Sequence, residues 1–333
     1  MPVRVAISMG DPSGIGAEVT ARALAALRGR IVPYVFGDGG VFAAAARRAR
    51  LSLPTVDLGE SLPAGGALVR VSSLPRSAAL PGRPARPGGA AQLAYLEAAY
   101  AAVEASQAEA LCTAPVSKAQ VQLALRGFVG HTEWLEARTG ARRSVMMLAS
   151  RSLRVALVTN HLRLGRVPRA VTTSELFATL TVTHTGLARD FGIARPRIAV
   201  CALNPHAGEG GAFGDEERTV IVPALARARR VGLRASGPYP ADSIYARAVK
   251  GEFHAVVALY HDQGLIPAKL LDAVTGDPAV NVTLGLPIVR TSPDHGVAYD
   301  LAGRGAASAA SMTAALRLAA ELARRRRDLD RSR

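Results

Sequence analysis

The stretch VRVAISMGDPSGIGAEVTARALAA, residues 3 to 26, decides the fold class. A short β-branched run at residues 3–8 leads through a Gly/Pro turn into residues 17–26, which have the period of a helix. The same alternation of β-branched runs with Ala/Leu/Glu/Arg stretches continues along the chain. This pattern is typical of a largely parallel sheet covered by helices, so we predict an α/β fold.

The boundaries of the main elements follow from the same pattern. The segment LPRSAALPGRPARPGG, residues 74–89, is rich in Pro, Gly and Arg and predicts an irregular loop. The expected strands are 3–8, 32–36, 110–113, 144–149, 154–158, 197–202 and 255–260. The expected helices are 17–26, 90–105, 220–229 and 311–325.

Length and composition indicate a globular protein of the cytoplasm. With 333 residues, 49% of them hydrophobic, the chain can form one large α/β domain or two lobes. Its apolar runs are far shorter than the roughly 20 residues that cross a bilayer, and its N-terminus does not resemble a signal peptide. Cys112 and Cys201 lie in apolar runs, so we expect buried core residues and no disulfide or thiolate metal site.

The formal net charge of +15 raises the question of a nucleic-acid partner. The basic residues are dispersed, apart from the tail ELARRRRDLDRSR, and no aromatic residues alternate with them as a base-stacking surface would require. We therefore expect neither a nucleic-acid nor a membrane partner. Only three lysines accompany the many arginines, which indicates a biased overall composition; a second interpretation is that the surplus positive potential helps to attract a small anionic substrate.

Three histidines stand directly after predicted strands, in the segments TNHLRL, LNPHAGEGG and YHDQG. They are His161, His206 and His261. Strand ends in open α/β sheets point at the ligand crevice, and imidazole is a common ligand of first-row divalent ions. A metal site is one interpretation; single histidines that act as structural or acid/base groups are another. Four neighbouring residues could fix the imidazole tautomers: Asn160, Asn204, Asp262 and Gln263.

The glycines of the first turn, Gly14 and Gly16, suggest a dinucleotide fingerprint. The third glycine is missing, and a partial fingerprint is weak, so we do not predict a Rossmann dinucleotide fold. We expect a tight strand-to-helix turn instead, whose amide groups could contact an anion.

Several long segments together resemble one known family. They are GDPSGIGAEV (10–19), TAPVSKA (113–119), GHTEWL (130–135), the three histidine segments, GPYPADSIY (237–245), YHDQGLIPAK (260–269) and VNVTLGLPIVRTSPDHG (280–296). In this order they resemble the 4-hydroxythreonine-4-phosphate dehydrogenase family of pyridoxal phosphate biosynthesis, within the isocitrate/isopropylmalate dehydrogenase-like superfamily. The resemblance runs essentially from end to end.

The resemblance implies a two-lobed α/β/α subunit. Residues 1–128 with 282–333 would form lobe one, and residues 129–281 would form lobe two. It also implies a homodimer with the active site at the interface. A divalent ion, Zn²⁺, Mg²⁺ or Co²⁺, would be held by His161, His206 and His261.

The resemblance further assigns contacts with substrate and cofactor. The substrate-binding residues would be His131, Thr132, Lys269, Asn281 and Arg290. His131 and Thr132 could instead serve to orient and cap a helix. The segment DHGVAYDLAGRGAAS (294–308) would wrap NAD or NADP, with His295, Gly296 and Asp300 as cofactor contacts. The catalytic base would be Lys269 or, through water, Asp242.

The implied reaction is oxidation of 4-phosphooxy-threonine at C3 to a 2-amino-3-oxo acid, which decarboxylates to 3-amino-2-oxopropyl phosphate for pyridoxine 5′-phosphate synthesis. The alternatives are a dehydrogenase of threonate or erythronate 4-phosphate, a metal-dependent hydrolase or phosphotransferase, and a nucleic-acid-binding protein. Two features depart from the family pattern. The segment between Lys269 and Asn281 is about three residues longer, and Ala212 stands where a histidine is common.

Overall fold

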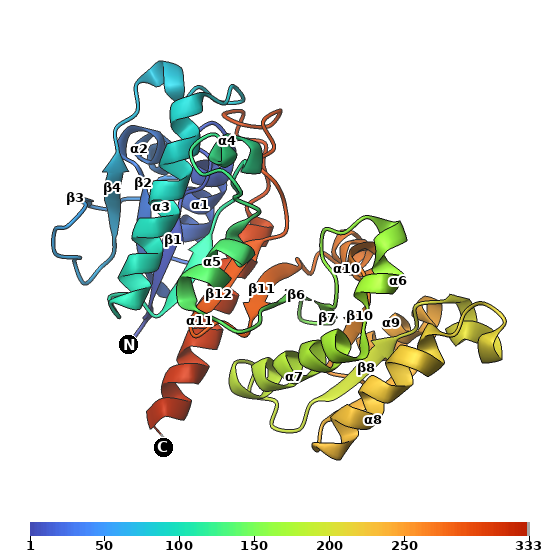
Figure 1. The fold of residues 1–333 in the computed structure, drawn as a ribbon. Coiled ribbons are helices and arrows are strands. Elements are labelled where there is room, and N and C mark those ends of the chain that lie inside the picture. The colour runs from blue at the N-terminus through green and yellow to red at the C-terminus, as the bar shows by residue number, and fades with distance from the viewer. Residues whose placement is uncertain (332–333) are drawn as a thin grey trace. The chain divides into compact units, whose positions relative to one another are not determined.

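The computed structural model describes residues 1–331 and divides the chain into two compact units (Figure 1). Unit 1 consists of Met1–Gly140 and Pro287–Asp328. Unit 2 consists of Ala141–Leu286 together with the described residues beyond Asp328. Both units contain a sheet with helices, which confirms the α/β class.

The boundary between the units differs from the predicted lobes at helix α5 (His131–Thr139). We expected α5 in lobe two, but it belongs to unit 1. Its Trp134 packs edge-on against Tyr100 of helix α3 (Arg86–Glu104), with ring centroids 5.8 Å apart. Packing of a large aromatic side chain against a helix of unit 1 explains this assignment.

The sheet of unit 1 has the strand order β3-β4-β2-β1-β5-β12. Each of these neighbouring pairs is parallel, as the alternation of strands and helices predicted. The strands are β1 (Val3–Ser8), β2 (Ile31–Asp38), β3 (Thr55–Asp57), β4 (Ala67–Ser72), β5 (Ala110–Thr113) and β12 (Val289–Pro293).

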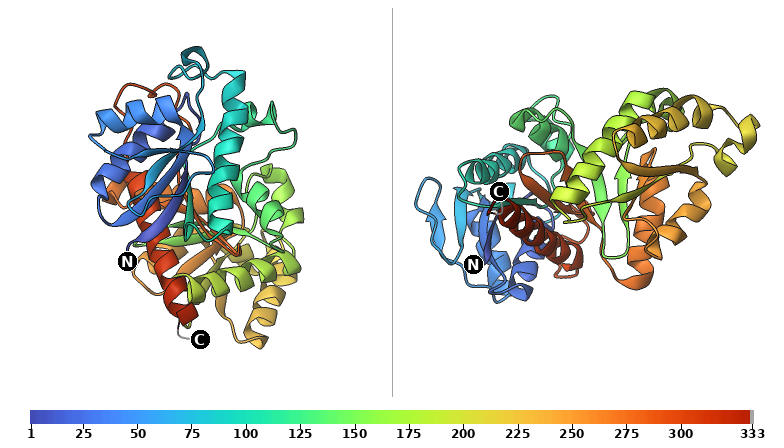
Figure 2. Two further views of the ribbon diagram at one scale, coloured as in Figure 1. Left: turned by 90° about the vertical axis from the view of Figure 1, so that its left-hand side faces the viewer. Right: turned by 90° about the horizontal axis from the view of Figure 1, so that it is seen from below.

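Helices cover both faces of this sheet. Helix α3 packs on β1 and β2, whereas α1 (Gly16–Ala26) and α2 (Gly39–Arg48) lie on the opposite face (Figures 1 and 2). The remaining elements of unit 1 are a short turn of 3₁₀-helix η1 (Arg76–Ala78), α4 (Lys118–Gln122), α5 and most of α11 (Ala310–Arg331).

Helix α3 begins earlier than predicted, within the Pro/Gly-rich segment that we expected to be irregular. It starts at Arg86 because Pro87 follows as an early helical residue, where a missing N–H costs no hydrogen bond. Gly89 is required in its first turns, since a Cβ there would lie 2.0 Å from the carbonyl oxygen of Gln120. The pattern of residue types alone did not reveal this close packing of α3 against α4.

The sheet of unit 2 has the strand order β11-β6-β7-β10-β8-β9 and is mixed. Strand β6 is antiparallel to both β7 and β11, whereas β7, β10, β8 and β9 pair in parallel, so the expectation of a largely parallel sheet holds with β6 as an exception. Residues 150–153 connect β6 to β7, which is too short for a parallel crossover. The strands are β6 (Val145–Ala149), β7 (Arg154–Leu157), β8 (Arg197–Cys201), β9 (Arg234–Tyr239), β10 (Ala255–Ala258) and β11 (Val280–Leu284).

Helices α7 (Thr173–Arg189) and α8 (Val222–Arg230) cover one face of this sheet, and α9 (Ala241–Val249) and α10 (His261–Thr275) cover the other (Figure 2). Short elements complete the unit: η2 (Leu164–Arg166), α6 (Val167–Ala170), η3 (Pro205–Gly211) and η4 (Glu217–Ile221). Among residues 1–331, no helix is long and apolar enough to span a membrane.

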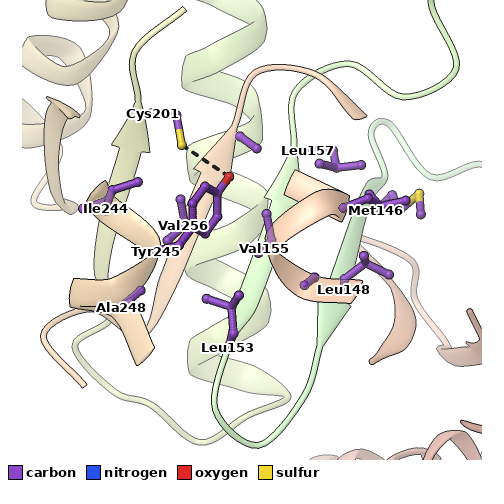
Figure 3. Close-up of a cluster of buried hydrophobic side chains, with 14 residues drawn as sticks. Met146, Leu148, Leu153, Val155, Leu157, Cys201, Ile244, Tyr245, Ala248 and Val256 are labelled. Carbon is purple, nitrogen blue, oxygen red and sulfur yellow. Dashed lines mark hydrogen bonds between the residues drawn. The ribbon is translucent and has the colours of Figure 1, made fainter. Parts of the chain in front are cut away.

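The core of unit 2 lies between the sheet and the helices α9 and α10. Aliphatic side chains such as Val155 and Ile244 gather there around Tyr245, whose hydroxyl lies 3.5 Å from the Cys201 thiol (Figure 3). Cys201 and Cys112 are both free and buried, as predicted. Burial raises the pKa of each thiol to about 12, so neither presents a thiolate at neutral pH.

Candidate active site

Three neighbouring parallel strands of unit 2 carry the histidines. The sheet places β10 between β7 and β8, and both pairings are parallel. His161 follows β7, His261 follows β10 and His206 follows β8. Since the carboxyl ends of parallel strands meet at one sheet edge, all three loops leave the sheet at the same edge.

Two of the three imidazoles lie side by side. The ring centroids of His161 and His261 are 5.4 Å apart, a separation that would allow both rings to bind one ion. His206 is exposed, and its ring lies 6.5 Å from that of Phe213. In residues 1–331, no group of three or more His, Cys, Asp or Glu side chains is arranged to hold a metal ion. The structure therefore brings His161 and His261 together but does not bring His206 into the same set.

A chain of hydrogen bonds connects the three strand ends. Thr159 donates its amide and its hydroxyl to the carbonyl oxygen of Leu259, at 3.2 and 2.8 Å. The Leu259 amide donates to Oε1 of Gln263 at 2.7 Å, and Nε2 of Gln263 donates to the carbonyl of Ala202 at 2.7 Å. Gln263 is buried, and Tyr245 donates its hydroxyl to the Gln263 carbonyl. This one side chain thus links the end of β10 to the end of β8.

The loop of His206 is held by Glu217. The Glu217 carboxylate accepts hydrogen bonds from the amides of Leu203 and Asn204 and from the side chain of Asn204. Burial alone would raise the pKa of Glu217, but these hydrogen bonds leave it lowered. The residues from 206 to 210 all have positive φ, between 41° and 82°. The segment GEGG places glycine at residues 208 and 210, where it adopts positive φ without steric cost.

The four polar neighbours of the histidines have different roles. Oδ1 of Asp262 lies 2.7 Å from Nδ1 of His261 and can fix its tautomer. The Asn204 side chain donates to Glu217. The Gln263 side chain bonds to the backbone of Leu259 and Ala202. Oδ1 of Asn160 is buried and has no hydrogen-bond partner among the described residues.

The other predicted residues of unit 2 lie on regular elements. Lys269 is exposed on α10, so the longer segment that follows it begins within a helix. That helix ends at Thr275, and Gly276, with φ of 66°, caps it. Asn281 lies on β11 and is half-buried, whereas Asp242 is exposed in the first turn of α9.

Unit 1 contains a buried cation on β12. The Arg290 side chain is 3% exposed and donates from Nη2 to Oγ1 of Thr113, at the end of β5, at 2.7 Å. Burial lowers the pKa of Arg290 to about 10, so the group stays charged at neutral pH. Arg290 is therefore a buried, hydrogen-bonded guanidinium and not a solvated surface arginine.

His131 is the first residue of α5 and lies near this cation. Burial and the charges of Arg290 and Lys118 hold the pKa of His131 far below its usual value, so the imidazole is neutral at pH 7. Its Nε2 is buried without a hydrogen-bond partner in the described part of the chain. The N-cap of α5 is Gly130, so Thr132 is not the cap considered above. Lys118 was not predicted, although it lies in the quoted segment TAPVSKA.

The turn after β1 makes close contact with the predicted cofactor loop. A Cβ at Gly14 would lie 2.9 Å from the carbonyl oxygen of Val297, and the amide of Ile15 donates to that oxygen at 3.0 Å. The Gly14 amide donates to the Asp11 carbonyl. These two amides are occupied within the chain, which corrects the expectation that the turn offers them to an anion. In the loop itself His295 is half-buried, whereas Gly296 and Asp300 are exposed.

Comparisons with known proteins agree with the resemblance drawn from the motifs. A family model described as pyridoxal phosphate biosynthetic protein PdxA matches residues 30–319. The chain is 48% identical over 329 residues to 4-hydroxythreonine-4-phosphate dehydrogenase of Geobacter metallireducens, with 96% of each chain covered. It is 43% identical to the enzyme of that name from Caulobacter vibrioides, covering 97% of this chain and 98% of the other.

The fold agrees as well. A crystal structure of 4-hydroxythreonine-4-phosphate dehydrogenase from Klebsiella pneumoniae has a TM-score of 0.83 and 34% identity, covering 96% of this chain and 99% of the other. Because both the sequence and the fold match along nearly the whole length, the chain belongs to the PdxA family, the 4-hydroxythreonine-4-phosphate dehydrogenases.

Proposed function

We propose that this protein oxidises 4-phosphooxy-threonine with NAD⁺ or NADP⁺ in the presence of a divalent metal. A hydride leaves C3 for the nicotinamide, and the proton of the C3 hydroxyl leaves to a base. The resulting 2-amino-3-oxo acid loses CO₂ and gives 3-amino-2-oxopropyl phosphate, for the synthesis of pyridoxine 5′-phosphate. The activity named for the relatives supports this proposal.

One observation carries the proposal furthest. Nε2 of His131 and Oδ1 of Asn281 are both buried without a hydrogen-bond partner in the described residues. An unpaired buried polar atom in a folded protein calls for an explanation, and a bound ligand supplies one. Each of these atoms can accept a hydrogen bond from a hydroxyl or amine group of a small substrate. Thr132, beside His131 on α5, would add a further hydroxyl contact.

The charges in unit 1 suit an anionic substrate. Arg290 is a buried guanidinium, and Lys118 is an exposed ammonium at the start of α4. A guanidinium offers a planar set of donors that matches a phosphate or carboxylate. The neutral His131 can donate or accept one hydrogen bond without adding charge.

The proposed metal ligands are His161, His206 and His261. The adjacent rings of His161 and His261 fit a shared ion, and the loop of His206 leaves the same sheet edge. Three imidazoles suit Zn²⁺ or Co²⁺, and Mg²⁺ remains a candidate from the family. A bound ion would polarise the substrate hydroxyl and the later ketone. Asp262 orients His261. Gln263 links the ends of β10 and β8, from which His261 and His206 follow.

Two groups are proposed for the proton of the hydroxyl, Lys269 and Asp242. Both side chains are exposed and stand on helices of unit 2, so each can exchange protons with water. His295, Gly296 and Asp300 are proposed to contact the dinucleotide. Nε2 of His295 is another buried nitrogen with no partner among residues 1–331.

The proposed homodimer would use α10. Ile266, Leu270 and Val274 are 66%, 62% and 76% exposed and follow one another at four-residue spacing on this helix. An exposed apolar stripe of this kind is typical of a protein–protein interface. Since α10 begins with His261 and carries Lys269, a second copy docked there would lie beside proposed active-site residues.

The test is a comparison of substrates. Purified enzyme with restored metal is assayed for NADH formation with 4-phosphooxy-threonine, threonate 4-phosphate and erythronate 4-phosphate. We expect the highest kcat/KM with 4-phosphooxy-threonine. No NADH from any substrate, together with release of phosphate, would refute the proposal in favour of a metal-dependent hydrolase.

A second candidate function is oxidation of threonate or erythronate 4-phosphate. Ala212, an exposed residue beside the His206 loop, stands where the family commonly has histidine, and this difference favours an altered substrate. A larger kcat/KM with either sugar-acid phosphate in the same assay would select this function.

A further inference from the structure

The buried carboxylate of Asp11, in the turn after β1, has no part in the function proposed above. It is 1% exposed, and no salt bridge among the described residues involves it. Three neutral donors surround it instead. Oδ2 accepts from the Tyr299 hydroxyl at 2.7 Å and from Nε2 of Gln92 at 2.9 Å, and Oδ1 accepts from the Ser13 amide at 2.8 Å.

These donors come from segments far apart in the chain. Tyr299 belongs to the 294–308 loop and Gln92 to α3. Oε1 of the same Gln92 accepts from the Ser117 amide at 2.7 Å, directly before Lys118. The Asp11 amide donates to the Pro115 carbonyl at 2.9 Å. Asp11 therefore connects the 294–308 loop with the segment that precedes α4.

The backbone of the turn supports the same connection. Gly10 has φ of 76°, and a Cβ there would lie 2.3 Å from the Pro115 oxygen. On the other side of the turn, the Ile15 amide donates to the Val297 carbonyl, and the Ser13 carbonyl accepts from the Gly82 amide. Gly82 in turn packs against the Tyr299 carbonyl. Burial raises the pKa of Asp11, while the three hydrogen bonds favour its charged form. Burial of a carboxylate is costly, and here only hydrogen bonds from neutral groups offset that cost. These bonds in turn fix the positions of the Tyr299 hydroxyl and the Gln92 amide.

We propose that Asp11 is a positioning residue that anchors the 294–308 loop, through the Tyr299 hydroxyl, in the conformation that binds the dinucleotide. This inference rests on the proposed cofactor role of that loop. Asp11 itself contacts neither substrate nor cofactor in this account. Its effect passes through Tyr299 to the neighbouring His295, Gly296 and Asp300.

The test removes only the hydroxyl, in Tyr299→Phe. Because this change removes a hydrogen bond to a buried carboxylate, the loop should open about ten-fold more often. Arg304 is an exposed residue of the loop, and trypsin cleavage there reports this opening. We expect cleavage at Arg304 to be about ten-fold faster and KM for NAD⁺ to rise by a similar factor. KM for the substrate and kcat should stay near wild type.

Tyr34→Phe is the matched control, because the Tyr34 hydroxyl donates to the Pro63 carbonyl elsewhere in unit 1. Tyr34→Phe should change neither the rate of cleavage at Arg304 nor KM for NAD⁺. Unchanged cleavage at Arg304 in Tyr299→Phe would overturn the anchor. Faster cleavage with an unchanged KM for NAD⁺ would show that Asp11 anchors the loop but would refute the proposal that this anchoring assists dinucleotide binding. The proposed reaction is tested separately, since NADH formation by the wild type does not depend on either variant.

Discussion

The imidazole of His131 is buried among cationic neighbours, Arg290 and Lys118. Protonation would add a third positive charge beside these two, and burial further disfavours the charged form, so the neutral form prevails. A neutral ring can accept a hydrogen bond from a substrate hydroxyl or ammonium group, which an imidazolium cannot. At the scale of single residues, burial and charge thus explain why a histidine suits this position better than a lysine.

The lowered pKa of His131 predicts how stability depends on pH. The unfolded chain binds a proton at His131 below about pH 6.5, whereas the folded chain does not. The free energy of unfolding should therefore fall as pH drops below 6.5, by up to about 1.4 kcal/mol per pH unit from this group.

Urea unfolding of wild type and His131→Asn at pH 7.5, 6.5 and 5.5 measures this effect. His254 also has a lowered pKa, caused by burial and by Arg197, and it remains in both proteins. The difference between them thus isolates His131. Equal pH slopes for the two proteins would mean that His131 is protonated normally in the folded state.

At the scale of elements, three loops after β7, β10 and β8 carry the proposed metal ligands. The sequence placed each histidine after a strand, because short β-branched runs are recognisable locally. The order of these strands in the sheet was not predictable, since it depends on pairings between distant segments. The antiparallel β6 and the early start of α3 were missed for the same reason. The contacts of Gln263, Asp11 and Tyr299 likewise arise only on folding, although the quoted segments contain all three residues.

Gln263 provides a test at this scale. Gln263→Leu leaves the Leu259 amide and the Ala202 carbonyl buried without their partner, and it loosens β10 from β8. We expect metal affinity to fall about 10–100-fold, as is usual when a residue that orients ligands is lost. Isothermal titration with Zn²⁺ gives the affinity, and thermal unfolding shows whether the variant is folded.

Gln122→Leu is the control, because it removes a single glutamine hydrogen bond, to the Phe128 carbonyl, in unit 1. Its metal affinity should equal that of wild type. A folded Gln263→Leu protein with wild-type affinity would contradict the role given to Gln263.

At the scale of the whole molecule, each unit contributes its own chemistry. Unit 1 holds the buried cation Arg290, the neutral His131 and the predicted cofactor loop, whereas unit 2 holds the three histidines, Lys269 and Asn281. The family resemblance, and not periodicity, supplied the roles of these residues. The exposed stripe on α10 adds a reason to expect a second copy of the chain.

Leu270→Glu tests the dimer. The charge should prevent burial of the α10 stripe, so sedimentation velocity should give the mass of a single 34.6 kDa chain where wild type gives twice that mass. Val231→Glu, at another exposed apolar position of unit 2, should remain dimeric. A dimeric Leu270→Glu protein would exclude this face as the interface, and a monomeric wild type would exclude the dimer.

The yield of NADH and CO₂ from 4-phosphooxy-threonine measures the proposed metal-dependent oxidation and decarboxylation most directly. Wild type with metal restored should form the two in equal amounts, and stripped enzyme should form neither. His261→Ala should lose bound metal and on the order of a thousand-fold in rate, while His184→Ala should match wild type. Undiminished NADH formation by the stripped enzyme and by His261→Ala, or NADH without CO₂, would contradict the account.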